Sequence, residues 1–135
     1  MSNIETIMHE IVDIQYKSKQ FMDVLASNGE LPPSQIVLLI KLKTSGGLKA
    51  AEIASFAGVT PGAVTSMCDK LEKTGLITRV RDTTDRRVVR MQLTSEGDKY
   101  VQKTFAKYPP HQLKELATIL HEVNQLMNKI VSKSS

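Results

Sequence analysis

Five arginines are the residues of this chain best suited to binding chemistry, and all of them lie between positions 79 and 90. They are Arg79, Arg81, Arg86, Arg87 and Arg90. A guanidinium group is planar and permanently charged, so it can contact a phosphate or a base edge through two parallel hydrogen bonds. Residues 60–93 contain seven basic and four acidic side chains, a net charge of +3 out of +4 for the whole chain. This clustering predicts one surface for an anionic partner; the alternative is a charged hairpin that faces only solvent.

Cysteine and histidine offer little further chemistry. The single cysteine, Cys68, cannot form an internal disulfide, and on the inner face of a helix a thiol behaves as a small inert hydrophobic group. The histidines, His9, His111 and His121, lack the spacing that places two metal ligands on one helical face. Neither a catalytic constellation nor a glycine-rich phosphate loop is recognisable. The sequence therefore predicts no enzyme, no metal site and no cofactor.

Length and composition limit the class of protein. With 135 residues the chain is near the usual size of one domain and can form one buried core. Its 41% hydrophobic and 24% charged residues are typical of a globular chain rather than a disordered one. The longest aliphatic run, Ile36 to Ile40, is too short to span a bilayer, and the N-terminal stretch lacks the basic region of a secretory signal. We expect a cytoplasmic protein without a membrane segment.

Hydrophobic periodicity predicts a mainly α-helical chain with one small β-hairpin. Apolar residues at helical spacing and turn signals bound the helices, whereas two β-branched stretches around a polar loop indicate strands. The helices are predicted over 3–26, between Pro32-Pro33 and Gly46-Gly47, over 49–56 and 61–73, from the N-cap Thr94 to Pro109-Pro110, and along the C-terminal segment. The strands are predicted over 76–80 and 88–93.

The C-terminal helix has a regular apolar stripe that must be buried by something. The stripe is a heptad seam of Leu113, Leu116, Leu120, Val123, Met127 and Ile130. A face this wide needs a partner surface, and packing against the first helix, within the chain and across a dimer, supplies it. The sequence predicts a homodimer; the alternative is a monomer that folds both terminal helices onto its own core.

Residues 49–73 have the spacing of a helix-turn-helix. Ala54 is small where two helices cross, and Gly58 suits a tight turn in which a positive φ is cheap only for glycine. Thr60 is a predicted N-cap, and Pro61 takes the first helical position, where its missing N–H costs nothing. The inward stripe of the second helix is predicted to contain Val59, Val64, Met67, Cys68 and Leu71.

The opposite face of the second helix fits the major groove of DNA. Proline and glycine at its start let the backbone approach the duplex, two hydroxyl groups follow that can reach base edges or phosphates, and lysines further along suit phosphate contacts. The predicted DNA-binding residues of this helix are Thr60, Pro61, Gly62, Thr65, Ser66, Lys70 and Lys73. The alternative, a structural helix pair that binds no DNA, does not account for the arginine-rich hairpin that follows.

A helix-turn-helix followed by a basic hairpin is a winged helix, and here the chain resembles the MarR (multiple antibiotic resistance) family of transcriptional regulators. The resemblance runs from about Leu31 to Gly97. The motifs that carry it are Ala51-Glu52-Ile53-Ala54, Val59-Thr60-Pro61-Gly62-Ala63-Val64-Thr65, Asp69-Lys70-Leu71-Glu72-Lys73-Thr74-Gly75-Leu76-Ile77, Asp82-Thr83-Thr84-Asp85-Arg86-Arg87 and Leu93-Thr94-Ser95-Glu96-Gly97.

The resemblance implies a homodimer that binds a pseudo-palindrome in double-stranded DNA. In this family the second helix of the motif enters the major groove and a wing arginine reaches the minor groove. By position that arginine is Arg87, oriented by Asp85, with Arg86 beside it. The implied organisation is a helical dimerisation region of residues 1–30 and 95–135 and a winged helix-turn-helix lobe of residues 31–94.

The sequence thus predicts a transcriptional regulator, a repressor that acts by occlusion and is released by a small-molecule effector. The residues that bind this effector cannot be identified from the sequence. Two alternatives stay open: a winged-helix module that binds another protein rather than DNA, and a redox or metal sensor on the same scaffold.

Overall fold

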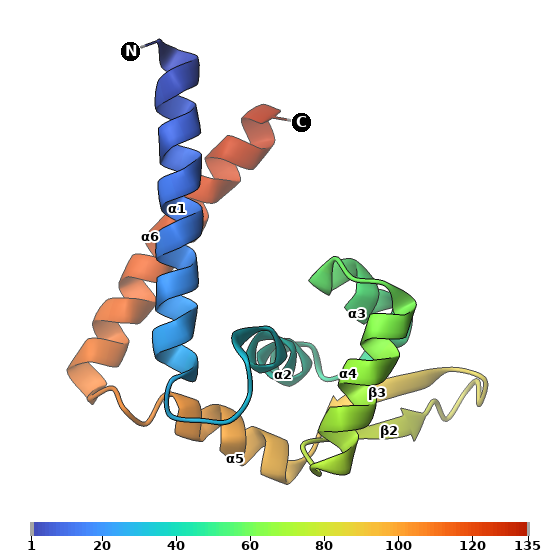
Figure 1. Ribbon diagram of the computed structural model, residues 1–135. Helices are drawn as coiled ribbons and strands as arrows, with labels where there is room; N and C mark the ends of the chain where they lie inside the picture. Colours follow the sequence, from blue (N-terminus) through green and yellow to red (C-terminus); the bar gives the residue numbers. More distant parts are fainter. Residues whose placement is uncertain (1, 135) are drawn as a thin grey trace. The chain divides into compact units, whose positions relative to one another are not determined.

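The computed structural model describes residues 2–134, and within them the chain forms helices and one small sheet (Figure 1). The elements are α1 (Asn3–Ala26), α2 (Pro33–Ser45), β1 (Leu48–Lys49), α3 (Ala50–Ala57), α4 (Pro61–Lys73), β2 (Ile77–Arg81), β3 (Val89–Leu93), α5 (Ser95–Thr104) and α6 (Pro110–Ser134). The chain divides into two compact units, Met1–Thr104 and Phe105–Ser135, and α6 is the helix of the second. The expected fold class, mainly α with a β-hairpin wing, is confirmed.

The sheet has three strands rather than the two of the predicted hairpin. Its order is β1-β3-β2, all antiparallel, and β1 pairs Leu48 with Met91 and Lys49 with Arg90. The helix predicted from about residue 49 begins at Ala50, with Lys49 in β1. A two-residue strand has no periodicity of its own, and it exists only because β3 lies beside it.

The core of the first unit is built around α2, whose aliphatic run is buried on several sides. Ile36, Leu39 and Leu42 of this helix are almost completely inaccessible. They meet side chains from the neighbouring elements, because α2 contacts α1, α3, α5 and β3. A helix that is apolar around most of its circumference is expected at the centre of a fold. The other fully buried side chains of this core are Val64, Cys68, Leu71, Ile53 and Ile77.

The end of the wing and the start of α5 are joined at Thr94. The Thr94 hydroxyl donates to the carbonyl of Gly75 at 2.6 Å and accepts from the N–H of Gly97 at 3.0 Å, which confirms the predicted N-cap. The Thr94 N–H donates to the carbonyl of Leu76 at 3.1 Å. Gly97 is buried, and a Cβ there would fall within 2.6 Å of Leu93 Cδ1. This junction therefore leaves no room for a side chain at position 97.

The loop between α1 and α2 is held by a side chain from far along the chain. The phenolic oxygen of Tyr100, in α5, accepts from the backbone N–H groups of Glu30 at 3.0 Å and Leu31 at 3.1 Å. The Tyr100 hydroxyl thus provides an acceptor for two backbone N–H groups of a loop that lies outside the helices and strands.

Each unit contains a long helix with large apolar side chains on its surface. In α1, Ile4, Ile7, Met8 and Ile11 are all more than half exposed. None of the described residues of α6 is buried, although the helix carries the heptad seam. None of the helices in residues 2–134 combines the length and the apolar character needed to cross a bilayer.

Candidate nucleic-acid interface

The start of α4 is fixed by local chemistry that the sequence predicted. The Thr60 side chain accepts from the backbone N–H of Ala63 at 3.2 Å, and Pro61 occupies the first turn. Gly58 ends α3 with φ 66°, a left-handed conformation that favours glycine. The turn of the helix-turn-helix is therefore held at both ends, which sets the direction in which α4 leaves it.

The two faces of α4 differ in burial as expected, whereas the turn before the helix does not follow the prediction. Val64, Cys68 and Leu71 are buried and Met67 is half-buried, whereas the predicted DNA-binding residues are all exposed. Val59 was predicted to face inward, and this was wrong: its side chain is 36% exposed. Val59 precedes the helix and lies in the turn, so the helical period does not govern its direction.

Cys68 lies on the buried face of α4. Its side chain is 1% exposed, and burial raises the pKa of its thiol. A thiol that is both inaccessible and held in the protonated state is a poor nucleophile. This environment matches the expectation of an inert, structural cysteine.

The wing is a hairpin whose tip is closed by its own side chains. β2 and β3 pair along their length, from Ile77 opposite Leu93 to Arg81 opposite Val89. At the tip, the Asp82 carboxylate accepts from the N–H and the hydroxyl of Thr84, at 3.0 and 2.9 Å, and these bonds hold its pKa below the usual range. Such an aspartate turn orders a polar loop without apolar contacts.

Arg87 is held by Asp85 and projects into solvent. Its Nε lies 3.1 Å from Asp85 Oδ1 and its Nη2 lies 3.2 Å from Asp85 Oδ2, and its backbone N–H also donates to Oδ1 at 3.1 Å. The hydrogen bonds from Arg87 hold the pKa of the Asp85 carboxyl below its usual range. The Arg87 side chain is still 91% exposed. The predicted pairing of these two residues is confirmed, while the contact of Arg87 with DNA stays a prediction.

The arginines of the cluster differ in the partners that they contact. Arg86 and Arg87 lie exposed in the loop of the hairpin. Arg81 donates to the carbonyl of Arg86 at 2.8 Å, and Arg90 lies 3.8 Å from a carboxylate oxygen of Glu52 in α3. The bond to a neutral carbonyl leaves the charge of Arg81 in place, whereas the Glu52 carboxylate partly offsets that of Arg90.

Arg79 has partners that sequence reasoning missed. Its Nη2 lies 2.6 Å from Asp69 Oδ1, and its Nη1 pairs with Glu72 Oε1, so one guanidinium group contacts two carboxylates of α4. Strand alternation gave one available clue: Arg79 follows the buried Ile77 by two residues and so shares its face of the sheet. The sequence did not indicate that α4 lies against that face.

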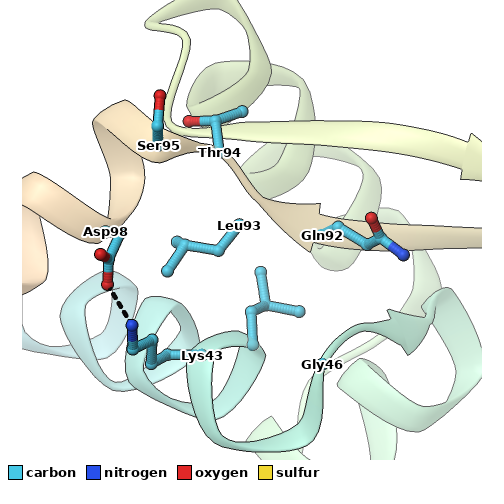
Figure 2. Close-up of a pocket in the computed structure, with 8 residues that line it drawn as sticks. Lys43, Gly46, Gln92, Leu93, Thr94, Ser95 and Asp98 are labelled. Atoms are coloured by element: carbon cyan, nitrogen blue, oxygen red, sulfur yellow. Dashed lines mark ion pairs between the residues drawn. The ribbon is translucent and has the colours of Figure 1, made fainter.

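A hollow of about 330 Å³ lies where α2 ends, β3 ends and α5 begins (Figure 2). Lys43 of α2 and Asp98 of α5 meet across it, with Nζ 2.5 Å from Oδ1. The hydrogen bond from Lys43 holds the pKa of the Asp98 carboxyl below its usual range. Gln92 and Leu93 of β3 also border the hollow. Among the described residues, no three histidine, cysteine or carboxylate side chains are grouped so as to hold a metal ion.

The arrangement of α3, α4 and the β2–β3 hairpin defines a winged helix-turn-helix protein. Residues 31–89 match the model of the MarR family, and these residues contain α2 to α4 and most of the wing. The helix-turn-helix and most of the wing are therefore similar to the MarR family.

A curated relative supports this similarity. The chain is 39% identical over 98 residues to the HTH-type transcriptional repressor MdtR of Bacillus subtilis strain 168. The match covers 73% of this chain and 61% of the relative, so the chain spans less than two thirds of the length of MdtR.

Solved structures share the fold over nearly the whole chain. The transcriptional regulator BldR of Sulfolobus solfataricus is 26% identical, with a TM-score of 0.70 and coverage of 98% of this chain and 99% of that one. A mutant of MarR from Escherichia coli, in a complex with operator DNA, is 19% identical, with a TM-score of 0.64 and coverage of 89% and 94%. At that identity the second likeness concerns the fold alone.

Proposed function

We propose that this protein is a transcriptional regulator that binds double-stranded DNA through α4 and the wing. The observation that carries the proposal is the geometry of one lobe: a capped helix exposes its small and polar face, and a hairpin beside it exposes an arginine held by Asp85. Relatives named as transcriptional regulators support a regulatory rather than an enzymatic role. The E. coli structure with operator DNA supports duplex DNA as the partner of this fold.

In this proposal α4 enters the major groove. Pro61 and Gly62 present no long side chain, so the helix start can approach the bases closely. The Thr65 hydroxyl donates to the Pro61 carbonyl at 3.1 Å, which leaves its oxygen to accept from an amino group of adenine or cytosine. Ser66 is the second base-edge contact, and Lys70 and Lys73 contact phosphates, which position the helix but carry no sequence information.

The wing lies in the minor groove next to the site of α4. Arg87 enters the groove in the direction set by its paired contact with Asp85, and Arg86 adds charge at the tip. Arginine favours narrow, A·T-rich minor grooves because their negative potential is enhanced. The acid beside it reduces the number of rotamers of Arg87 and so the entropy lost on binding.

The functional form is a homodimer. Residues 1–30 and 95–135 form its dimerisation region, and residues 31–94 form the DNA-binding lobe. The large exposed apolar side chains of α1 and α6 support this division, because contiguous apolar surface on a protein marks an interface. Two lobes about 34 Å apart, one turn of DNA, then contact the two halves of a pseudo-palindrome.

The regulator acts in the cytoplasm as a repressor that occludes a promoter, and a small-molecule effector releases it. The name of MdtR as a repressor supports the direction of regulation. The effector acts by binding one spacing of the two lobes better than another, because a ligand shifts an equilibrium only through a difference in affinity.

Selection of genomic duplex fragments by the purified protein tests the proposal. The parent is compared with Arg86→Ala/Arg87→Ala and with Lys129→Ala/Lys133→Ala, which removes the same charge from α6. We expect the parent and the lysine variant to enrich one pseudo-palindrome and the arginine variant to lose it. In binding titrations, Arg87→Ala alone costs about 1–3 kcal/mol.

Two further measurements complete the test. For a dimer that neutralises about six to ten phosphates, the logarithm of affinity falls with the logarithm of salt concentration with a slope of about −5 to −9. Weak, salt-insensitive binding with no enriched fragment contradicts DNA recognition and favours a protein-interaction module. A monomer in sedimentation at micromolar concentration contradicts the dimer.

A further inference from the structure

The side of α4 that we propose faces DNA contains Gly62, Thr65, Ser66, Lys70 and Lys73, and we call it the recognition surface. It has a carboxylate at its centre. At 100° per residue, position 69 lies on the same side of the helix as positions 62, 66 and 73. The Asp69 side chain is 59% exposed, and Glu72 follows it on the edge of this surface with 39% exposed. A carboxylate facing the phosphates of DNA opposes binding, because like charges across an interface repel each other. The surface therefore needs a charge that cancels these two acids.

The side chains of α4 itself do not supply this positive charge. The helix contains two lysines, Lys70 and Lys73, and the two acids Asp69 and Glu72, so its side chains carry no net charge. Arg79 changes this balance from the adjacent strand β2, since its guanidinium contacts both carboxylates at once. Asp69 raises the pKa of Arg79 further above its already high value, so the cation persists at any physiological pH.

We infer that Arg79 is the counter-ion of the recognition helix: it neutralises Asp69 and Glu72 so that α4 can approach DNA, and it does not itself contact the duplex. Arg79 is thus a positioning residue, distinct from the arginines at the wing tip. Its pairs also join α4 to β2, a strand of the wing, so both DNA-contacting elements are fixed in one orientation. This inference rests on the proposed function, because it concerns DNA binding by α4.

A double-mutant cycle tests the inference. The probe is a fluorescein-labelled duplex of mixed sequence and about 30 base pairs at about 50 mM salt, where electrostatic binding is strong and base readout does not contribute. We expect Arg79→Ala to weaken binding about tenfold in the parent protein, because two carboxylates are left facing DNA. In the Asp69→Asn/Glu72→Gln background, the same substitution changes affinity by less than about twofold.

The acid-free variant with Arg79 intact gives an independent reading if Arg79→Ala fails to fold. Asp69→Asn/Glu72→Gln raises affinity severalfold, because the surface gains positive charge. A control with the same change in net charge, Asp13→Asn/Asp23→Asn, removes the exposed acids that pair with Lys17 and Lys19 on α1. We expect a smaller gain from this control, because α1 is not part of the proposed DNA-binding surface.

Three results overturn the inference. If the loss caused by Arg79→Ala persists in the acid-free background, Arg79 either contacts phosphates or serves only to hold α4 in place. If Asp69→Asn/Glu72→Gln weakens binding, or strengthens it no more than the α1 control, the acids do not oppose DNA. If the parent itself does not bind the duplex, the proposed function fails and the inference fails with it; the first two results leave the proposed function standing.

Discussion

Gly97 is the position at which a single added methyl group should destabilise the fold most clearly. A Cβ there falls well inside van der Waals contact with the Leu76 carbonyl oxygen, and it lies 2.6 Å from Cδ1 and 3.0 Å from Cγ of Leu93. The Leu76 oxygen accepts from the Thr94 N–H at 3.1 Å, so moving it also stretches that hydrogen bond. The backbone cannot yield here without separating the base of the wing from α5.

The magnitude follows from three contributions. Forcing a methyl group into a packed site costs about 3 kcal/mol, and weakening the hydrogen bond to Leu76 adds about 1 kcal/mol. Alanine recovers about 1 kcal/mol because it has a higher helix propensity than glycine. The free energy of unfolding of Gly97→Ala is therefore about 3 kcal/mol lower than that of the parent. For a chain of this size the melting temperature falls by about 10 °C.

The same substitution at Gly62 is the matched control. Gly62 lies in the first turn of α4, and the nearest atom to an added Cβ is the Thr60 hydroxyl oxygen at 4.0 Å. Without a steric clash only the propensity gain remains, so Gly62→Ala raises the free energy of unfolding by about 0.5 kcal/mol. Both variants are measured by urea denaturation at one protein concentration, because the stability of the proposed dimer depends on concentration. Equal stability of Gly97→Ala and the parent refutes the steric argument.

Three further expectations concern single contacts. Thr60→Ala removes the cap of α4 and lowers the free energy of unfolding by about 1 kcal/mol, whereas Thr60→Ser, which keeps the hydroxyl, stays within a few tenths of the parent in the same urea titration. Tyr100→Phe deprives two backbone N–H groups of the α1–α2 loop of their acceptor; it costs about 1 kcal/mol and speeds amide hydrogen exchange in that loop, and unchanged exchange there contradicts the assignment. The ion pair of Asp98 with Lys43 lowers the pKa of the carboxyl, so its stabilisation is complete above the unfolded pKa and is lost as pH falls through the lowered folded value. Urea midpoints at about pH 6 and about pH 3 should therefore differ less in Asp98→Asn than in the parent, and an equal difference contradicts the role of the pair.

The helices, the wing strands and the turn between α3 and α4 could be predicted because each depends on neighbours in the sequence. The N-cap at Thr60 bonds to a residue three positions later, and Gly58 needs only its own backbone freedom. The buried stripe of Val64, Cys68 and Leu71 follows from the helical period. The pairing of Asp85 with Arg87 spans two residues. In these cases the local chain carries enough information to determine the structure.

Other features depend on which segments meet, and the sequence pattern does not specify that. β1 exists because Leu48 lies opposite Met91, and Tyr100 holds a loop that is 69 and 70 residues away along the chain. Arg79 was grouped with the wing arginines by its position in the sequence, yet it pairs with carboxylates of α4.

By itself, then, the sequence determined the order of the elements, the helix-turn-helix with its caps, and the exposed face of α4. The tertiary structure alone decided which charges remain available on the proposed recognition surface. The physical reason is the distance along the chain over which each interaction acts. Periodicity and capping act over one or two helical turns, whereas an ion pair between a strand and a helix forms only when packing of the core brings the two elements together.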